Sequence, residues 1–598
     1  MILARNMSKM RMVLGCIVKM LYALAWPIWS NRIFVSMMLL MFSLCIWREW
    51  IFQIETLLHY WHFCFDIYIL CLFIVILPKR CQCYFKRLCY VVAYLTTFVE
   101  IFIMEGFHVL FTPTTINLWH ETTPKESREF IMTYCFGTAM WITLVLLSLA
   151  VLCHVVLNRL HLIKWMSAEP FRFLFSLSVI SLLIISVGPV WGEKKLLTRF
   201  LSSPVQAEKI KPELFYSPIY RLAYSLYMLH LAEQDLCELR LSMRQIEVDS
   251  CTYKCPNIVL VIGESYNKHH AQLYGYRHQT TPNMVRMRKE KSLAVFFDAI
   301  TPWNLTSKVF KNMFSTHNMN KGGKWTDGVM FPAIMRKAGY KVAFLTNQYP
   351  KRADQNGVDF CGSFFFNDAE LDSMCFDFRN TACYDLDGDF IREYERYEKS
   401  EHNFVLFHLY GQHVKYDCRY DASSVYFTPD SIDRRKLNRE QKQIVADYDN
   451  ATLYNDKVFA RICRYFEQDD AIVIYLSDHG EEVYDYSWMF GRTPGDDISA
   501  PIAYYEFDIP MMMWFSPRFK QEHSDVVAKA RAAYKQPFIS SNISQLILGL
   551  AGVHCRWYES YRDLLSEEYS PGCRYLKGTV AYDSIVAGTK FEKRWKRK

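Results

Sequence analysis

The feature that most constrains the fold of this chain is a set of long apolar segments confined to its first 190 residues. Five of them lie near residues 33–47, 60–77, 90–110, 131–157 and 171–190. Each approaches the ~20 residues that a helix needs to cross a ~30 Å hydrocarbon core, and the first is the shortest. Further spans follow the first, and no small-residue cleavage site is evident, so a cleaved signal peptide is not expected. We predict an α-helical membrane domain of five transmembrane helices over residues 1–190.

Basic residues in the short loops predict the orientation of these spans. They gather in three segments, at Arg5–Arg32, Lys79–Arg87 and Arg159–Arg172, which all fall on one side of a five-span bundle. Short loops rich in Lys and Arg remain in the cytoplasm. An odd number of spans then puts everything after about residue 190 on the opposite side of the membrane. The net charge of +8 is modest for 598 residues, so no nucleic-acid partner is predicted.

Two further features of this part of the chain each allow two interpretations. Glu100 and Glu105 fall within the third span, where a carboxylate has a functional or cavity-facing role or, for Glu105, lies at the outer interface. Residues 191–250 form a linker with a helical pattern from Pro218 to Arg244. That helix either lies in the membrane interface as an amphipathic helix or packs on the domain that follows.

The remainder, residues 251–598, reads as a folded α/β domain. Five short apolar runs, most followed by helix-compatible sequence, are typical of buried and mostly parallel strands alternating with helices. They lie at Asn257–Ser265, Val342–Thr346, Phe404–Leu409, Ala471–Leu476 and Ile509–Phe515. In such sheets, functional sites collect at the carboxyl ends of the strands.

The polar residues at these strand ends suggest a metal site. The first run ends in Glu264, the fourth leads into Ser477-Asp478-His479-Gly480-Glu481, and the third contains His408 and leads to His413. Carboxylates and an imidazole at strand ends suit a divalent cation such as zinc. A solvated loop is the usual explanation of a lone Asp-His pair, but Asp-His-Gly-Glu placed directly after an apolar strand is a much stronger signal.

At these residues the chain resembles a known family, the phosphoethanolamine transferases of the bacterial inner membrane, in the alkaline phosphatase superfamily. It looks most like the branch that modifies the lipopolysaccharide core. The five amino-terminal spans and outer catalytic domain also fit this family, so the resemblance covers nearly the whole chain. The matching stretches are Asn257–Pro282, Leu409–Tyr420, Asp447–Asp456 and Ser477–Asp485, followed by Gly491-Arg492.

The resemblance implies a zinc ion, a threonine nucleophile and their residues. Zinc would be held by Glu264, Thr306, Asp478 and His479, with Thr306 as the nucleophile. Metal coordination and a helix N-terminus would make its weakly nucleophilic hydroxyl competent. Ser307 and Thr301 are the alternatives for the nucleophile, and an ordinary helix N-cap is the alternative role for Thr306.

The family also implies residues that bind substrate. His413 and His408 match histidines that line the phosphate or ethanolamine pocket; the alternatives are a surface histidine and a hydrogen-bonded core histidine, respectively. Thr122 and Glu126 resemble a Thr and a Glu that approach the donor lipid, although a plain solvated loop is also an adequate explanation.

The chain departs from the family pattern at several positions. Family members often carry a histidine between the Asp-His-Gly-Glu motif and the following Gly, but Tyr486–Gly491 contains none. Donor-site detail and any second metal are less well supported than the zinc ligands for this reason. The other departures are Leu118, Thr123 and, where many members have a cysteine pair, Pro302 and Asn312.

Cysteine usage fits a domain outside the cytoplasm. Ten of the 19 cysteines lie at or after Cys237, and in an oxidising compartment some of them should pair. Cys251 and Cys255 are close enough to form one disulfide. A zinc site at these two is less favoured, because no second Cys or His pair follows at metal spacing.

The resemblance predicts a multi-pass enzyme of the bacterial inner membrane with its catalytic domain in the periplasm. It would transfer phosphoethanolamine from phosphatidylethanolamine to lipopolysaccharide, at a core sugar or at lipid A. Glycerol-phosphate transfer and hydrolysis by a phosphatase- or sulfatase-type site are the alternatives, although the sulfatase motif C-x-P-S-R is absent. A non-catalytic lipid-binding envelope protein is a further alternative, and the intact Glu264, Asp478 and His479 argue against it.

Overall fold

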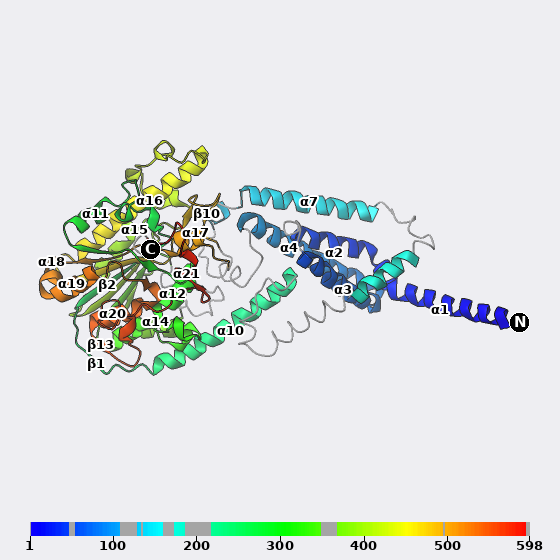
Figure 1. The fold of residues 1–598 in the computed structure, drawn as a ribbon, viewed down its shortest axis with the longest axis horizontal. Helices are drawn as coiled ribbons and strands as arrows, with labels where there is room; N and C mark the ends of the chain where they lie inside the picture. The colour runs from blue at the N-terminus through cyan, green and yellow to red at the C-terminus, as the bar shows by residue number, and fades with distance from the viewer. Residues whose placement is uncertain are drawn as a thin grey trace. The chain divides into compact units, whose positions relative to one another are not determined.

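The computed structural model describes residues 2–46, 54–107, 128, 130–132, 135–159, 173–185, 217–348, 368–493 and 497–593. The described residues belong to two compact units, and the chain passes from one to the other at Ala232–Glu233. The described part of the first unit is helical, whereas the second combines helices with a central sheet (Figure 1). The passage falls inside helix α10 (Pro218–Arg244), which occupies the helical pattern predicted for the linker.

The first unit contains a set of apolar helices. Helix α4 packs against α2 and α7, and α1 packs against α3. Their bounds are α1 (Ile2–Ser30), α2 (Arg32–Cys45), α3 (Ile54–Ile76), α4 (Lys79–Phe107) and α7 (Thr138–Arg159). Four segments are long and apolar enough to cross a membrane: Met10–Ser30, His59–Ile76, Lys79–Phe107 and Thr138–Arg159. Arg32–Cys45 and Phe173–Ile185 are shorter apolar helices.

All five predicted spans coincide with apolar helices among the described residues. Long apolar helices coincide with residues 60–77, 90–110 and 131–157. The predicted spans at 33–47 and 171–190 coincide with the two shorter helices. Helix α1 was not predicted as a span, because Arg11 and Lys19 lie within the segment and make it look like a basic cytoplasmic tail. A helix can tolerate such residues because their long side chains reach toward the interface.

A buried ion pair accounts for one of the two carboxylates in the third predicted span. Glu100 on α4 is buried and pairs with Arg221 on the first part of α10. One residue earlier, the Tyr220 hydroxyl donates to Asp66 Oδ2 on α3 at 2.6 Å. Glu100 thus faces the interior of this unit, where a partner offsets the cost of burying its charge.

The second unit is built on a seven-stranded sheet in the order β3-β11-β8-β2-β7-β5-β6. The predicted mostly parallel arrangement is confirmed for β2, β5, β6, β7 and β8, which pair in parallel. The predicted strand at Ile509–Phe515 is the exception, because β11 runs antiparallel to both β8 and β3. The bounds are β2 (Asn257–Gly263), β3 (Leu293–Phe296), β5 (Lys341–Thr346), β6 (Phe378–Arg379), β7 (Asn403–His408), β8 (Ala471–Ser477) and β11 (Met511–Phe515).

Both faces of this sheet are covered, which explains why its strands are continuously apolar. Along β2, Ile258, Leu260 and Ile262 enter one core, while Val259 and Val261 enter the other. Alternate side chains of a strand point to opposite faces, so a strand covered on both sides needs apolar residues throughout. Helices α11 and α16 lie on one side of the strands and α12, α14 and α20 on the other (Figure 1).

The helices of this unit fall into these two layers. One layer comprises α12 (Thr306–Phe314), α13 (Phe331–Lys337), α14 (Ala369–Cys375), α19 (Ser524–Ala532) and α20 (Ile543–Ala551). The other comprises α11 (Pro282–Lys289), α15 (Asp387–Phe390) and α16 (Arg439–Tyr465). Shorter elements complete the unit: β1 (Ser250–Cys251), β4 (Ala299–Ile300), β9 (Glu482–Val483), β10 (Phe490–Gly491), β12 (Phe538–Ile539), β13 (Val553–His554), β14 (Tyr575–Leu576), β15 (Val580–Ala581), α17 (Ala500–Ile502), α18 (Pro517–Glu522) and α21 (Tyr582–Val586).

Two details concern predictions about the start of this unit. Leu239 and Met243, near the end of α10, are buried in the core of the second unit, so this part of the helix packs on the domain. The predicted Cys251–Cys255 disulfide is wrong in this structure. Both thiols are free: that of Cys251 donates to the Ala551 carbonyl, and Cys255 is buried in the core. Their closeness in sequence did not require their side chains to meet.

Candidate active site

Two adjacent strands bring the predicted metal ligands together. Strands β2 and β8 pair in parallel with Gly263 opposite Ser477, so Glu264 and Asp478 leave the sheet side by side. Ligand atoms of Glu264, Asp478 and His479 all lie within 4.8 Å of one another, and all three residues are buried. The Nε2 atom of His479 is 3.0 Å from Asp478 Oδ2 and 3.4 Å from Glu264 Oε1.

Local backbone geometry fixes these side chains. Ser265 adopts a left-handed conformation with φ 55°, and its N–H donates to Asp478 Oδ1 at 3.0 Å. A non-glycine residue in this region is strained, and such strain persists where surrounding contacts hold it. The Ser265 hydroxyl also donates to Glu264 Oε1 at 2.8 Å. The turn after β2 thus orients the Glu264 side chain through the Ser265 hydroxyl and holds the Asp478 carboxylate through the Ser265 N–H.

Thr306 joins this cluster from helix α12. Its hydroxyl donates to Glu264 Oε2 at 3.0 Å and lies 3.4 Å from His479 Nε2. Thr306 is the first residue of the helix, and Leu305 occupies the N-cap position without a side-chain cap. Thr306 is therefore not the N-cap of α12, because its hydroxyl faces the Glu264 carboxylate.

The two alternative nucleophiles are placed differently. Thr301 is buried, and its hydroxyl oxygen accepts a hydrogen bond from Ser540 at 3.3 Å. Among the described residues, Ser307 makes no hydrogen bond to Glu264, Asp478 or His479. Of the three candidate nucleophiles, Thr306 is thus the one whose hydroxyl contacts the cluster.

The electrostatics of the cluster favour a bound cation. Burial and the neighbouring Glu264 carboxylate raise the pKa of Asp478. Burial alone would lower the pKa of His479, but Asp478 and Glu264 raise it to about 10. Asp478 Oδ2 is buried, and its 3.0 Å contact with His479 Nε2 does not have hydrogen-bond geometry. Two buried carboxylates that share one imidazole fit a divalent cation with O and N ligands.

The predicted substrate residues differ in their surroundings. His413 is half-buried on the loop after β7, and burial lowers its pKa to about 3. His408 is fully buried within β7, its Nδ1 lies 3.0 Å from the Thr346 hydroxyl, and burial lowers its pKa to about 4. Both imidazoles are therefore neutral near pH 7. Thr122 and Glu126 lie outside the described residues, as do Leu118 and Thr123.

The loop that carries His413 reaches Glu264 through a glycine. Gly411 has φ +50°, and a Cβ atom there would lie 2.8 Å from the Glu264 nitrogen. The Gln412 N–H donates to the Glu264 carbonyl at 3.0 Å. The close approach and the positive φ both require glycine, which explains the Gly411-Gln412-His413 pattern.

Sequence reasoning missed several side chains that touch the cluster. Gln348, after β5, donates from Nε2 to Glu264 Oε2 at 3.1 Å. Arg492 places Nη1 2.8 Å from His479 Nε2. The sequence shows that Gln348 follows the apolar run Val342–Thr346 and that Arg492 ends the motif Gly491-Arg492. It does not indicate that either side chain points toward Glu264 or His479.

Glu506 links the segment just before Thr306 to the segment after β10. This buried carboxylate sits in a π-helical turn (Ala503–Phe507) and accepts from Asn304 Nδ2 at 2.7 Å. It also accepts from the N–H and the hydroxyl of Thr493, at 2.9 and 2.7 Å, and from the Tyr486 hydroxyl at 3.0 Å. Irregular helical turns of this kind are frequent at functional sites.

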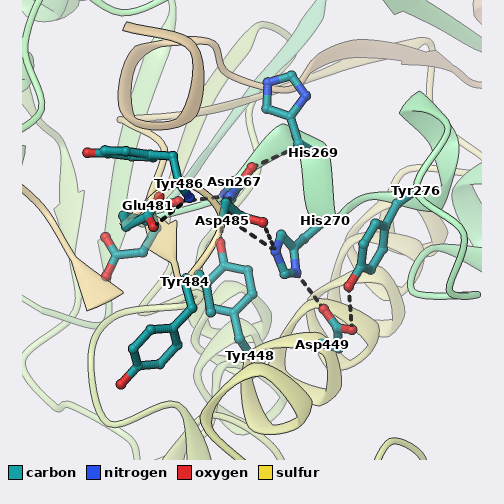
Figure 2. A network of polar contacts seen from close by, with 12 residues as sticks. Asn267, His269, His270, Tyr276, Tyr448, Asp449, Glu481, Tyr484, Asp485 and Tyr486 are labelled. Carbon is teal, nitrogen blue, oxygen red and sulfur yellow. Dashed lines mark hydrogen bonds and ion pairs between the residues drawn. The ribbon is translucent and has the colours of Figure 1, made fainter. Parts of the chain in front are cut away.

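A polar network behind the cluster explains the matching stretch Asp447–Asp456 on α16 (Figure 2). The Tyr448 hydroxyl donates to the Ser265 carbonyl and accepts from the Asn267 N–H, both at 2.6 Å. Asp449 Oδ1 lies 2.6 Å from His270 Nδ1. On the other side of this imidazole lies Asp485, 3.3 Å from Nε2 (Figure 2). The network ties α16 to the segments that follow both Glu264 and His479.

Comparisons with known proteins agree with this geometry. The family model described as Sulfatase matches residues 256–553, which include every residue of the cluster. These residues, just under half of the chain, are similar to that family. Phosphoethanolamine transferase EptC of Escherichia coli (strain K12) is 24% identical over 497 residues, covering 80% of this chain and 82% of the relative. Phosphoethanolamine transferase CptA of Salmonella typhimurium is also 24% identical, with the same coverage.

A solved membrane protein shares the fold beyond residues 256–553. The integral membrane protein lipooligosaccharide phosphoethanolamine transferase A of Neisseria meningitidis covers 91% of this chain and 98% of its own, with a TM-score of 0.55 and 19% identity. The predicted fold class, apolar membrane helices followed by an alkaline-phosphatase-like domain, is confirmed. The resemblance to the phosphoethanolamine transferase family is confirmed as well.

Proposed function

We propose that this chain is a zinc-dependent transferase that moves phosphoethanolamine from phosphatidylethanolamine to lipopolysaccharide. The observation that carries the proposal is the Thr306 hydroxyl at the start of α12, 3.0 Å from Glu264 within a buried set of metal-ligand residues. This arrangement occurs in a chain that is similar over 80% of its length to phosphoethanolamine transferases.

The proposed reaction has two displacements at phosphorus. In the first, Thr306 Oγ1 forms a bond to phosphorus while the bond to the diacylglycerol oxygen breaks, and that oxygen leaves with the proton of the threonine hydroxyl. In the second, an oxygen of the acceptor bonds to phosphorus while the bond between phosphorus and Thr306 Oγ1 breaks, and Thr306 Oγ1 regains a proton from that acceptor. Glu264 orients the hydroxyl through its 3.0 Å hydrogen bond. A covalent intermediate suits two lipid-anchored substrates that need not be bound together.

Zinc is the cation that the ligand set supports best. Glu264, Asp478 and His479 would hold it, with the Thr306 oxygen beside them. When bound, zinc lowers the pKa of a coordinated hydroxyl and stabilises negative charge on phosphoryl oxygens. His413 and His408, neutral near pH 7, and Thr122 and Glu126 are proposed to contribute to donor and acceptor binding.

The metal assignment is tested by replacing one ligand. We expect Asp478→Ala to lose most of the zinc that the purified full-length chain carries, measured by elemental analysis. Asp470→Asn is the matched control, because Asp470 contacts His523 rather than the cluster. Full zinc occupancy in Asp478→Ala would refute the ligand set.

The function is tested by mass spectrometry of lipopolysaccharide from cells with and without the gene. The proposal predicts a mass gain of one phosphoethanolamine that depends on the gene, and fragmentation identifies a core sugar or lipid A as acceptor. A gain of glycerol phosphate would support the alternative transfer, and phosphate loss would support a hydrolase. The proposed location, the inner membrane with a periplasmic catalytic domain, is supported by the apolar helices and the basic loops.

A further inference from the structure

A guanidinium group lies directly against the metal-ligand cluster. Arg492 follows β10, and Gly491 before it has φ +104°, which turns the chain at this point. The Arg492 side chain is 18% exposed, and its Nη1 lies 2.8 Å from His479 Nε2 and 4.0 Å from Glu264 Oε1. Its Nε lies 3.7 Å from Glu481 Oε2.

The tautomer of His479 shows what this contact means. Nδ1 lies 2.7 Å from the Gly480 carbonyl oxygen, which can only accept, so Nδ1 carries the proton. Nε2 is therefore the ring nitrogen that a metal ion would bind, and Arg492 Nη1 lies 2.8 Å from it. Arginine has five N–H donors and no acceptor. Arg492 therefore competes with a metal ion for the same nitrogen atom.

A guanidinium and a divalent cation cannot share one ligand atom. With a cation on His479 Nε2, the donors of Arg492 must turn to an anionic group beside it, while Glu481 stays within reach of Nε. The Thr306 hydroxyl is 3.4 Å from the same Nε2 atom. Any phosphoryl group on Thr306 would thus carry its oxygens toward the Arg492 guanidinium, whose Nη1 lies 2.8 Å from that same Nε2 atom.

The Glu506 carboxylate connects the segment that carries Arg492 to the segment that carries Thr306. Glu506 accepts from Thr493, the residue after Arg492, and from Asn304, two residues before Thr306. The two segments that Glu506 joins, at Asn304 and Thr493, are 189 residues apart in sequence. Donors held in advance where charge will develop stabilise a transition state without reorganising.

We propose that Arg492 is a catalytic residue that donates hydrogen bonds to the non-bridging oxygens of the phosphoryl group on its way through Thr306. This inference rests on the proposed function. Arg492 would act in both displacements and exchange no proton, because a guanidinium stays protonated. Two parallel N–H···O bonds to one phosphoryl group are the geometry that arginine offers and lysine does not.

The experiment uses full-length Arg492→Ala and Arg492→Lys, each loaded with zinc. We expect Arg492→Ala to bind inorganic phosphate about 10- to 100-fold more weakly than the unmodified chain by calorimetry. Transfer to lipopolysaccharide should fall by about 10²-fold or more. Added guanidinium ion should restore part of both, and Arg492→Lys should recover less than the unmodified activity. Arg518→Ala, which removes an exposed arginine of α18, should change neither.

Three results would overturn the proposal. They are unchanged phosphate binding in Arg492→Ala, loss of zinc from that variant, or failure of guanidinium to restore a folded, zinc-containing Arg492→Ala. The two proposals can fail separately. If the unmodified chain leaves lipopolysaccharide unchanged while its phosphate binding still depends on Arg492, the transferase assignment fails and the phosphoryl-binding role of Arg492 stands.

Discussion

At the scale of single residues, the position of Thr306 on α12 makes its role testable. Because the hydroxyl faces Glu264 and does not cap the helix, its removal should cost little stability. We expect Thr306→Ala to give a folded, zinc-containing protein whose transfer activity falls by several powers of ten, since the whole covalent path is lost. Lipopolysaccharide mass spectrometry, elemental analysis and thermal unfolding check the three parts.

The conservative variant controls for the loss of a methyl group. Thr306→Ser keeps a hydroxyl at the same place and should retain measurable transfer. Near-normal modification of lipopolysaccharide by Thr306→Ala would instead point to Ser307 or to a direct, one-step transfer.

The sequence predicted the metal-ligand residues of this site, but not the side chains that contact them. Glu264, Asp478 and His479 follow apolar strands, and strand ends of a parallel sheet meet at one edge, so their meeting could be expected. Gln348 and Arg492 could not be placed, because the direction of a side chain on a loop depends on packing from distant segments. The resemblance supplied Thr306, which spacing alone could not separate from Ser307 or Thr301.

At the scale of elements, Glu506 in the π-helical turn connects the segments that carry Thr306 and Arg492, which are proposed to act in catalysis. The Glu506 carboxylate accepts four hydrogen bonds. A glutamine at this position replaces one accepting oxygen by an NH₂ group, which would face the N–H and O–H groups that now donate to that oxygen. We expect Glu506→Gln to lower the free energy of unfolding by about 1–3 kcal/mol and transfer by about 10²-fold. The control Glu522→Gln alters an exposed carboxylate of α18. Normal activity in Glu506→Gln would show that this link is dispensable.

A second element-scale prediction concerns the attachment of the C-terminal segment to the start of β11. Asp508 is buried and pairs with Lys593, with Lys268 Nζ at 2.5 Å and with His269 Nε2 at 3.2 Å. We expect Asp508→Asn to cost about 3–5 kcal/mol of unfolding free energy, because two buried lysines lose their counterion. Thermal and urea unfolding measure this, with Asp525→Asn, which is 63% exposed, as control. A loss no larger than that of the control would contradict it.

The pH dependence of this cluster has a definite sign. Burial raises the pKa of Asp508, but Lys268 and Lys593 lower it well below the ordinary value of 3.8. A carboxylate with a depressed pKa stabilises the folded state above its ordinary pKa, and this contribution is lost as the pH falls below that value. The difference between Asp508→Asn and the unmodified chain should therefore shrink as the pH falls below about 4.

At the scale of the whole molecule, the basic loops predict that the amino terminus and the carboxyl terminus lie on opposite sides of the membrane. A reporter fused after Lys598 should be active only outside the cytoplasm, and one inserted at Pro78, between α3 and α4, only inside. Cytoplasmic activity of the Lys598 fusion would overturn this orientation. Helix α1 makes the test necessary, because an additional crossing by Met10–Ser30 would change the parity of the spans.

The fold was predictable where one residue pattern has one physical meaning. Continuous apolar runs required a sheet covered on both faces, and the two cores beside β2 match that requirement. The antiparallel direction of β11 was not readable, since an apolar run looks the same in either direction. Helix α1 was missed because its charges suggested a loop, and the free Cys251 and Cys255 show that spacing does not decide pairing.

The order of the central strands has a consequence for how the chain is made. Strand β2 emerges from the ribosome early, yet one of its partners, β8, comes so late that Ser265 and its Asp478 partner are 213 residues apart. At about 5–20 residues per second, roughly 10–40 s separate the two. Throughout that interval an apolar strand has an unpaired edge, and such edges aggregate. Nascent chains stopped before Ala471 should therefore require a holding chaperone and acquire no metal, which makes zinc loading a marker of completed synthesis.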